Sequence, residues 1–159
     1  MSGASNRHNR IATNVTVSLG GRLRHQRCQA FNSGTKVRIQ LPTHTRFYYP
    51  DAMVVCNPNP EGDSFQDTPS LVVEVLSSRT RRTDQGEKRD AYLTIPSLRI
   101  YLLVEQEALQ VVLFRRADQG FVREVYQGLA AVIPLAEVDC ELPLAEIYER
   151  VEFGPEEEG

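Results

Sequence analysis

Leu71-Val72-Val73-Glu74-Val75-Leu76 is the stretch of sequence that decides the fold. A nearly continuous apolar run of this length predicts a strand that is covered on both faces. Glu74 interrupts the run, and a carboxylate in such a place costs several kcal/mol unless another group compensates its charge. The sequence therefore leaves three interpretations of Glu74: a metal ligand, a buried ion-pair partner of an arginine, or a side chain on a face that is open to water.

A second apolar strand is predicted at residues 52–56, and Asp51 stands at its entrance directly after Pro50. Aspartate is common in turns and at strand entrances, so Asp51 alone is weak evidence for a site. Two carboxylates on neighbouring strands are stronger evidence, because hard divalent cations bind oxygen ligands that converge from separate elements. Asp51 and Glu74 are therefore the candidate metal-binding and catalytic carboxylates.

A helix is predicted from about Asp84 to residue 93, directly after the Glu74 strand. Asp84, Lys88 and Tyr92 are spaced to share one of its faces. Lys88 could then direct its ammonium group at a phosphate or at an attacking water. The alternatives are an ordinary surface ion pair for Lys88 and a helix N-cap role for Asp84.

The connection between that strand and helix is rich in hydroxyl and guanidinium groups. It contains Ser77, Ser78, Arg79, Thr80, Arg81 and Arg82. Such a loop could hold a phosphate backbone through charge-assisted hydrogen bonds. It could equally be a solvated connector.

The rest of the chain predicts an α/β fold, in which a mixed central β-sheet is flanked by helices. Ile11, Val15, Leu19 and Leu23 recur at helical spacing, with Ser5 or Asn6 as the cap. Further strands are predicted at residues 28–32, 36–41, 99–104, 110–115 and 121–126, and a short helix at 142–151. Residues 33–35 indicate a hairpin between the first two of these strands, and residues 57–69 an exposed loop. We expect one domain over residues 1–154, followed by an acidic tail at 155–159.

The chain has 159 residues and a net charge of −3, but its charges are unevenly distributed. Residues 1–50 carry eight of the 18 basic residues and none of the 21 acidic ones. This basic segment could contact a polyanion such as nucleic acid, or it could lie beside the later acids in the fold. No apolar run approaches the roughly 20 residues of a membrane helix, and the start has no apolar signal core, so we expect a cytoplasmic protein.

The remaining candidate groups point to no site. Three widely spaced cysteines, Cys28, Cys56 and Cys140, favour reduced thiols over a disulfide framework or a zinc site. The three histidines, His8, His25 and His44, have no ligand spacing and are expected at the surface or in capping positions. The chain has no glycine-rich phosphate loop, no Cys-x-x-Cys and no serine nucleophile elbow, which argues against kinase, redox and acyl-transfer chemistry.

These motifs resemble a bacterial restriction endonuclease-like family of the PD-(D/E)XK nuclease superfamily. The matching segments are Tyr49 to Cys56, Pro69 to Ser77, Thr80 to Asp84, Gly86-Glu87-Lys88 with Tyr92, Asn9-Arg10-Ile11 with Asn14, Ile100 to Val104 and Cys140 to Tyr148. The resemblance covers nearly the whole chain.

The resemblance implies a metal-dependent endonuclease that hydrolyses DNA, using Mg²⁺ or Mn²⁺. Asp51 and Glu74 would bind the metal, with the backbone carbonyl of Val75 as a further ligand. The family lysine, usually two residues after the glutamate, would be Lys88 here, since that position is Leu76. Ser77, Asp84 and Tyr92 would be supporting residues, and Arg79, Arg81 and Arg82 would contact phosphates.

One departure from the family pattern supports an alternative. Family members typically carry a glutamate-bearing segment ahead of the His-Asn stretch, and this chain has no carboxylate before Asp51. The alternative is a catalytically impaired nuclease-fold module that binds nucleic acid or assembles as a homodimer.

Overall fold

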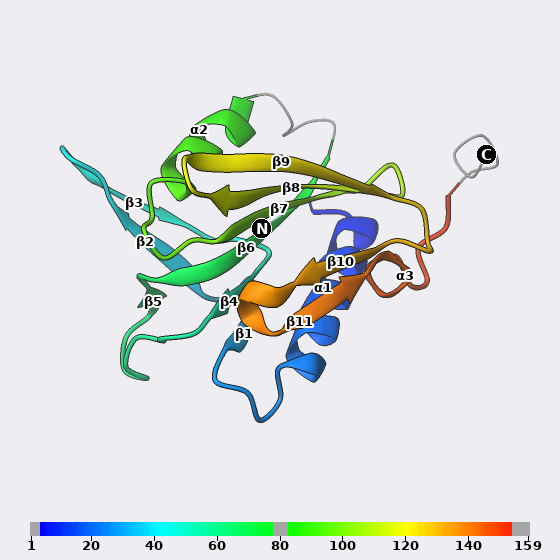
Figure 1. The fold of residues 1–159 in the computed structure, drawn as a ribbon, viewed down its shortest axis with the longest axis horizontal. Helices are drawn as coiled ribbons and strands as arrows, with labels where there is room; N and C mark the ends of the chain where they lie inside the picture. Colours follow the sequence, from blue (N-terminus) through cyan, green and yellow to red (C-terminus); the bar gives the residue numbers. More distant parts are fainter. Residues whose placement is uncertain (1–3, 78–82, 154–159) are drawn as a thin grey trace.

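A six-stranded mixed sheet forms the centre of the protein, in the order β1-β4-β6-β7-β8-β9 (Figure 1). The computed structural model describes residues 4–77 and 83–153, with only the backbone for 83–85. The strands are β1 Gln29–Asn32, β4 Ala52–Val55, β6 Pro69–Leu76, β7 Ile100–Glu105, β8 Gln110–Ala117 and β9 Gly120–Gln127. β6 and β7 are parallel and the other neighbouring pairs are antiparallel. The predicted α/β class and mixed sheet are confirmed.

Both faces of this sheet are covered, as the Glu74 stretch predicts. Alternate side chains of β6 enter two different cores, because successive residues of a strand point to opposite faces. Leu71, Val73 and Val75 pack on the side of α1 (Asn6–Arg22). Val72 and Leu76 pack on the side of α2 (Thr83–Tyr92), which connects β6 to β7.

The layer on the α1 side also contains the C-terminal elements (Figure 1). These are β10 Val132–Leu135, the 3-10 helix η1 Ala136–Val138, β11 Cys140–Pro143 and α3 Leu144–Ile147. The predicted helix over 142–151 is therefore too long, because residues 142 and 143 pair with β10 before the single turn of α3 begins. β10 was not predicted.

α1 forms as its spacing predicts. Ile11, Val15, Leu19 and Leu23 are each at most 4% exposed. Ser5 is the N-cap, and its hydroxyl accepts a 3.0 Å hydrogen bond from the backbone N–H of His8. The Ser5 hydroxyl also donates to Oε1 of Gln106, just after β7. The first turn of α1 is thereby held at the C-terminal ends of the central parallel strands.

The predicted hairpin over residues 28–41 is wrong. β1 pairs with β4 in the central sheet, whereas β2 (Lys36–Gln40) pairs with β3 (Thr45–Tyr48) and β5 (Phe65–Gln66) in a separate three-stranded sheet. The side chain of Asn32 accepts a hydrogen bond from the N–H of Gly34, and this turn redirects the chain into the second sheet. β3 was not predicted, and β5 lies within the predicted 57–69 loop.

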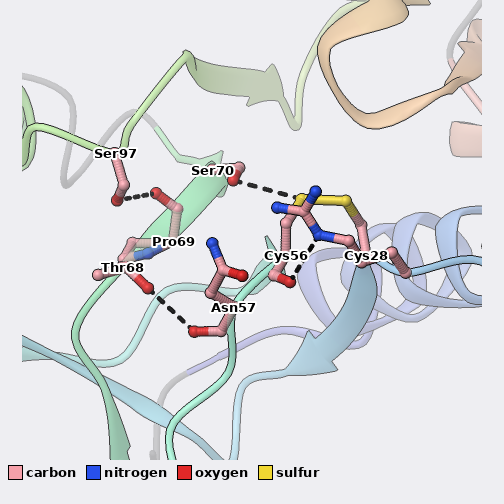
Figure 2. Close-up of a disulfide and its surroundings, with 8 residues drawn as sticks. Cys28, Cys56, Asn57, Thr68, Pro69, Ser70 and Ser97 are labelled. Atoms are coloured by element: carbon pink, nitrogen blue, oxygen red, sulfur yellow. Dashed lines mark hydrogen bonds between the residues drawn. A yellow bond between two sulfur atoms is a disulfide. The ribbon is translucent and has the colours of Figure 1, made fainter.

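The expectation of three reduced thiols is also wrong, because Cys28 and Cys56 form a disulfide (Figure 2). Cys28 immediately precedes β1 and Cys56 immediately follows β4, and their neighbours Gln29 and Val55 are paired across the two strands. The bridge therefore extends the β1–β4 ladder by one position. Their separation of 28 residues concealed this pairing in the sequence. Cys140 is free.

Several basic residues of the first 50 pair with acids from later in the chain. Arg38 binds Asp67 through two hydrogen bonds of 2.8 and 2.9 Å, and Arg46 binds Glu87 at 2.8 Å. Arg22 pairs with Glu146. The fold therefore balances part of the basic segment internally. Within 4–77 and 83–153, no helix is long and apolar enough to cross a membrane.

Candidate metal centre

Asp51 binds the β6 backbone on both sides of Glu74. Its backbone N–H donates a 3.0 Å hydrogen bond to the carbonyl of Val73. Its Oδ2 accepts a 2.7 Å hydrogen bond from the N–H of Val75. Because β4 and β6 are antiparallel, the entrance of β4 lies beside the end of β6. The backbone ladder therefore places Asp51 beside the Val73–Val75 segment of β6, which contains Glu74.

Glu74 is buried, with 8% of its surface exposed, on the α2 side of the sheet. Its Oε2 has no hydrogen-bond partner in the part of the chain that the structure describes. Burial raises the pKa of Glu74 to about 8, and the negative charge of Asp51 raises it further. Lys88, Tyr92 and His8 act in the opposite direction. The burial of Glu74 argues against a face that is open to water. No described arginine forms an ion pair with Glu74, while Arg79, Arg81 and Arg82 lie outside the described residues.

α2 brings Lys88 and Tyr92 to the same side of the sheet. The charge of Lys88 favours the ionised form of Glu74 and so lowers the pKa of Glu74. Its Nζ lies 5.8 Å from the centre of the Tyr48 ring. Tyr92 is fully buried between Tyr48 and Tyr101, with ring centroids 5.5 and 5.4 Å away. Lys88 and Tyr92, two of the three residues of the predicted helix face, thus both act on Glu74.

The Tyr92 hydroxyl and Oε2 of Glu74 are both buried polar atoms without a hydrogen bond among the described residues. The two groups are close enough to influence each other's pKa, yet their geometry falls outside that of a hydrogen bond. Burial, followed by the charge of Glu74, raises the pKa of Tyr92, so the phenol stays neutral. A buried pair that is left incompletely hydrogen-bonded is unusual, and for that reason this end of β6 is the candidate site.

His8 is the site residue that the sequence did not reveal. Its Nε2 lies 3.4 Å from Oδ1 of Asp51, and the two side chains are 21% and 16% exposed. The Asp51 carboxylate raises the pKa of His8. His8 was expected to be a surface or capping residue, because 43 positions separate it from Asp51 and no histidine lies at ligand spacing. Only the docking of α1 against the ends of β6 and β7 reveals the contact.

The other predicted site residues are partly outside the described region. The described residues do not include Arg79, Arg81 and Arg82. They include the backbone of Asp84, which belongs to α2, but not its side chain. Ser77 is half-buried at the end of β6. Val75 pairs with Val104 of β7. Among the described side chains, no three His, Cys, Asp or Glu residues are already arranged around a common metal position.

Two grooves in the described surface lie apart from these carboxylates. Two shallow grooves flank the exposed side of α1, and both are lined by Arg10, Thr13 and Arg150. Neither groove includes Asp51 or Glu74.

These features define an α/β protein whose mixed central sheet carries a carboxylate at the entrance of β4 and another within the neighbouring strand β6. The model of the Uma2 family, described as a "putative restriction endonuclease", matches residues 1–145. The chain belongs to this family, and the resemblance found in the sequence is confirmed.

Individual relatives agree with that assignment. Two proteins of Synechocystis, the uncharacterized proteins slr1290 and sll1609, are 33% and 32% identical over 121 and 114 residues. The matches cover 76% and 70% of this chain, but only 63% of each relative. The chain thus spans less than two thirds of their length. A solved structure from Anabaena variabilis, titled a "putative nuclease belonging to DUF820", shares the fold with a TM-score of 0.70. It is 18% identical, and the match covers 91% of this chain and 81% of that one.

Proposed function

We propose that this chain is a metal-dependent nuclease that hydrolyses phosphodiester bonds of DNA. The observation that carries the proposal is Glu74, a buried carboxylate whose Oε2 lacks a hydrogen-bond partner among the described residues and which lies beside Asp51. A divalent cation would compensate both charges, and the oxygen-rich donor set suits Mg²⁺ or Mn²⁺. The family and the fold support the nuclease class.

Asp51 and Glu74 would hold the cation, with the Val75 carbonyl as a further oxygen donor. The cation would supply Lewis-acid chemistry, lowering the pKa of a bound water and stabilising charge on the phosphate. Asp51 is held rigidly by Val73 and Val75, so the donors are positioned before substrate arrives. Lys88 is half-buried, and its charge acts on Glu74. Its ammonium group would orient the attacking water or neutralise charge on the scissile phosphate.

Cleavage of supercoiled plasmid and of single-stranded oligonucleotides in Mg²⁺ or Mn²⁺ tests this proposal. Wild type is expected to cleave, and Glu74→Gln and Lys88→Met are expected to lose cleavage while remaining folded by circular dichroism. Glu107→Gln is the matched control, because it makes the same charge change at an exposed loop position. Cleavage that persists in both site variants at the wild-type rate rejects the assignment.

The second candidate is a non-catalytic nucleic-acid-binding module on the same fold, which could also act as a homodimer. It is favoured by the absence, among the described residues, of three acidic, histidine or cysteine side chains grouped around one metal position. Binding of DNA that falls with salt, persists in EDTA and leads to no cleavage with any divalent metal would support it. Light scattering of the same samples measures the oligomeric state.

A further inference from the structure

The small sheet of β3, β2 and β5 presents aromatic and basic side chains on the face that is turned away from the core. Its β2–β3 hairpin projects from one side of the molecule (Figure 1). Side chains alternate along β2, so Val37 and Ile39 pack into the core on the α2 side and their neighbours point outwards. The outward face, which we call the outer face, carries Lys36, Arg38, Phe47, Tyr49 and Phe65.

The rings of the outer face are exposed and lie together. Phe47 is 49% exposed and Tyr49 is 58% exposed, whereas every other aromatic side chain of the described chain is buried or half-buried. The ring of Phe65 meets that of Phe47 edge to face, with centroids 6.5 Å apart. Single exposed apolar side chains are ordinary, but a group of them indicates a contact surface. The outer face therefore offers open ring surface to a partner.

Basic side chains lie directly beside these rings. The Nζ of Lys36 is 5.6 Å from the centre of the Phe47 ring, and the Cζ of Arg38 is 4.2 Å from the centre of the Phe65 ring. Arg38 pairs with Asp67, whereas Lys36 has no ion-pair partner among the residues that the structure describes. The outer face thus combines open rings with an unpaired ammonium group, a combination with which proteins bind unpaired bases and their phosphates.

The acidic side chains around the outer face favour one path for a phosphate backbone. Asp63 and Asp67 flank β5, and the charges of both act on Arg38. On the other border, β3 belongs to the acid-free first 50 residues, and Glu87 of α2 is paired with Arg46 of β3. Phosphates would be repelled at the β5 border and not along β3, so the favoured path follows β3.

β3 leads from the outer face to the proposed metal centre. Phe47, Tyr49 and Asp51 follow one another at every second position. Four residues of fully extended chain span at most about 14 Å. Phe47 is thus within about four nucleotides of Asp51, at roughly 3.4 Å per stacked nucleotide. The same strand carries Tyr48 on its other face, 5.8 Å from the Nζ of Lys88. A strand of DNA on the outer face would therefore end near the carboxylates.

We propose that the outer face is a stacking platform that binds single-stranded DNA beside the metal centre. Bases would stack on Phe47 and Tyr49, and Lys36 would contact a phosphate. The bases of a duplex are already stacked on one another, so the platform favours unpaired strands and single-stranded tails. The inference rests on the proposed nuclease function and adds to it the form of the substrate. An outer face that joins two copies of this chain is the competing explanation.

Fluorescence anisotropy in EDTA measures binding of a labelled oligothymidylate of about 12 nucleotides without cleavage. Wild type is expected to bind it more tightly than a hairpin duplex of the same length. Phe47→Ala and Tyr49→Ala should each weaken binding roughly 5–150-fold, the effect of losing one stacked base. Lys36→Gln should weaken binding and reduce the slope of its salt dependence by about one. Leu129→Ala is the matched control, because Leu129 is 55% exposed and lies outside the outer face.

A tryptophan placed on the platform reports stacking directly. The chain has no tryptophan of its own, so Phe47→Trp introduces a single indole and keeps an aromatic ring at this position. Oligothymidylate should bind this variant at least as well as wild type and should quench its emission. Leu129→Trp, with its indole at the control position, should show no quenching.

The outcomes separate this inference from the proposed nuclease function. Unchanged binding in Phe47→Ala and Tyr49→Ala, or no quenching in Phe47→Trp, overturns the inference, while plasmid cleavage that depends on Glu74 leaves the nuclease function intact. Equal affinity for the duplex, exclusive binding of an oligouridylate, or dimers in light scattering that Phe47→Ala abolishes would also overturn it. Quenching in a chain that cleaves no DNA with Mg²⁺ or Mn²⁺ would support the platform and defeat the nuclease function.

Discussion

The backbone N–H of Val75 donates a 2.7 Å hydrogen bond to Oδ2 of Asp51, so a proposed metal ligand also closes the end of the β4–β6 ladder. The same residue is therefore structural and functional. Variants at position 51 must separate the two roles, and the choice of substitution does so because asparagine retains an acceptor oxygen that alanine lacks.

Asp51→Ala is expected to destabilise the fold, and Asp51→Asn is expected to destabilise it much less. Alanine leaves the Val75 N–H without its acceptor, which costs about 1–3 kcal/mol for a buried donor. Urea denaturation in EDTA measures the difference. Both variants should lose metal-dependent cleavage, because neither retains the negative charge. An Asn variant as unstable as the Ala variant would show that charge, rather than the hydrogen bond, stabilises this end of the sheet.

Glu74→Gln is expected to stabilise the metal-free protein at high pH. The pKa of Glu74 is raised from 4.5 to about 8 in the folded state, so the folded chain holds a proton that the unfolded chain releases. The stability of wild type should therefore fall as pH rises from about 4.5 to about 8, and level off above that range. The variant lacks this component, and its advantage above pH 8 should reach a few kcal/mol, at about 1.4 kcal/mol per pKa unit.

Thermal denaturation in EDTA from pH 4 to pH 9 measures this effect, with Glu107→Gln as the exposed control. Saturating Mn²⁺ should then raise the Tm of wild type and leave that of Glu74→Gln unchanged. A Glu74→Gln variant that is less stable than wild type at pH 9 would mean that a cation within the protein already neutralises the carboxylate.

Lys88→Met is expected to reduce cleavage by roughly 10²–10³-fold while preserving stability. Methionine keeps an unbranched apolar side chain of similar length and removes the ammonium group, whose Nζ lies 5.8 Å from the centre of the Tyr48 ring, so the loss is expected to be electrostatic. Arg89→Met is the matched control, since Arg89 is the next residue of α2 and its guanidinium lies over Phe114, 5.5 Å from the ring centre. Single-turnover cleavage at saturating metal measures both. Equal losses in the two variants would assign the effect to the general charge of α2.

Removal of the Cys28–Cys56 bridge is expected to lower the free energy of unfolding by about 3–4 kcal/mol, the entropic value for a loop of 28 residues. Urea denaturation of wild type with and without reductant, beside the double variant Cys28→Ser/Cys56→Ser, measures this loss. Reductant should shift the midpoint of wild type and leave that of the double variant unchanged. Cys140→Ser, at the free cysteine, should respond to reductant as wild type does.

The sequence predicted those parts of the molecule that a local pattern determines. The apolar run around Glu74 predicted a strand covered on both faces, and the spacing of Ile11 and Leu19 predicted α1. The sequence did not predict which strands pair with one another in the sheets. β1 and β2 looked like a hairpin, yet they belong to different sheets because partners distant in the chain compete for them. The disulfide between Cys28 and Cys56 and the ion pair between His8 and Asp51 join residues that are distant in the sequence. The spacing of these residues along the chain does not predict either contact.

The sulfur bridge at the margin of the sheet also affects how the molecule moves. β1 is four residues long and is the outermost strand, a position where thermal fluctuations open a sheet most easily. The next strand inward is β4, and Asp51 immediately precedes it, at the end of the ladder opposite the bridge. We expect the bridge to restrict the opening of this outer strand at the end of the ladder that lies farther from Asp51. Reduction of the bridge should therefore loosen the margin of the sheet first.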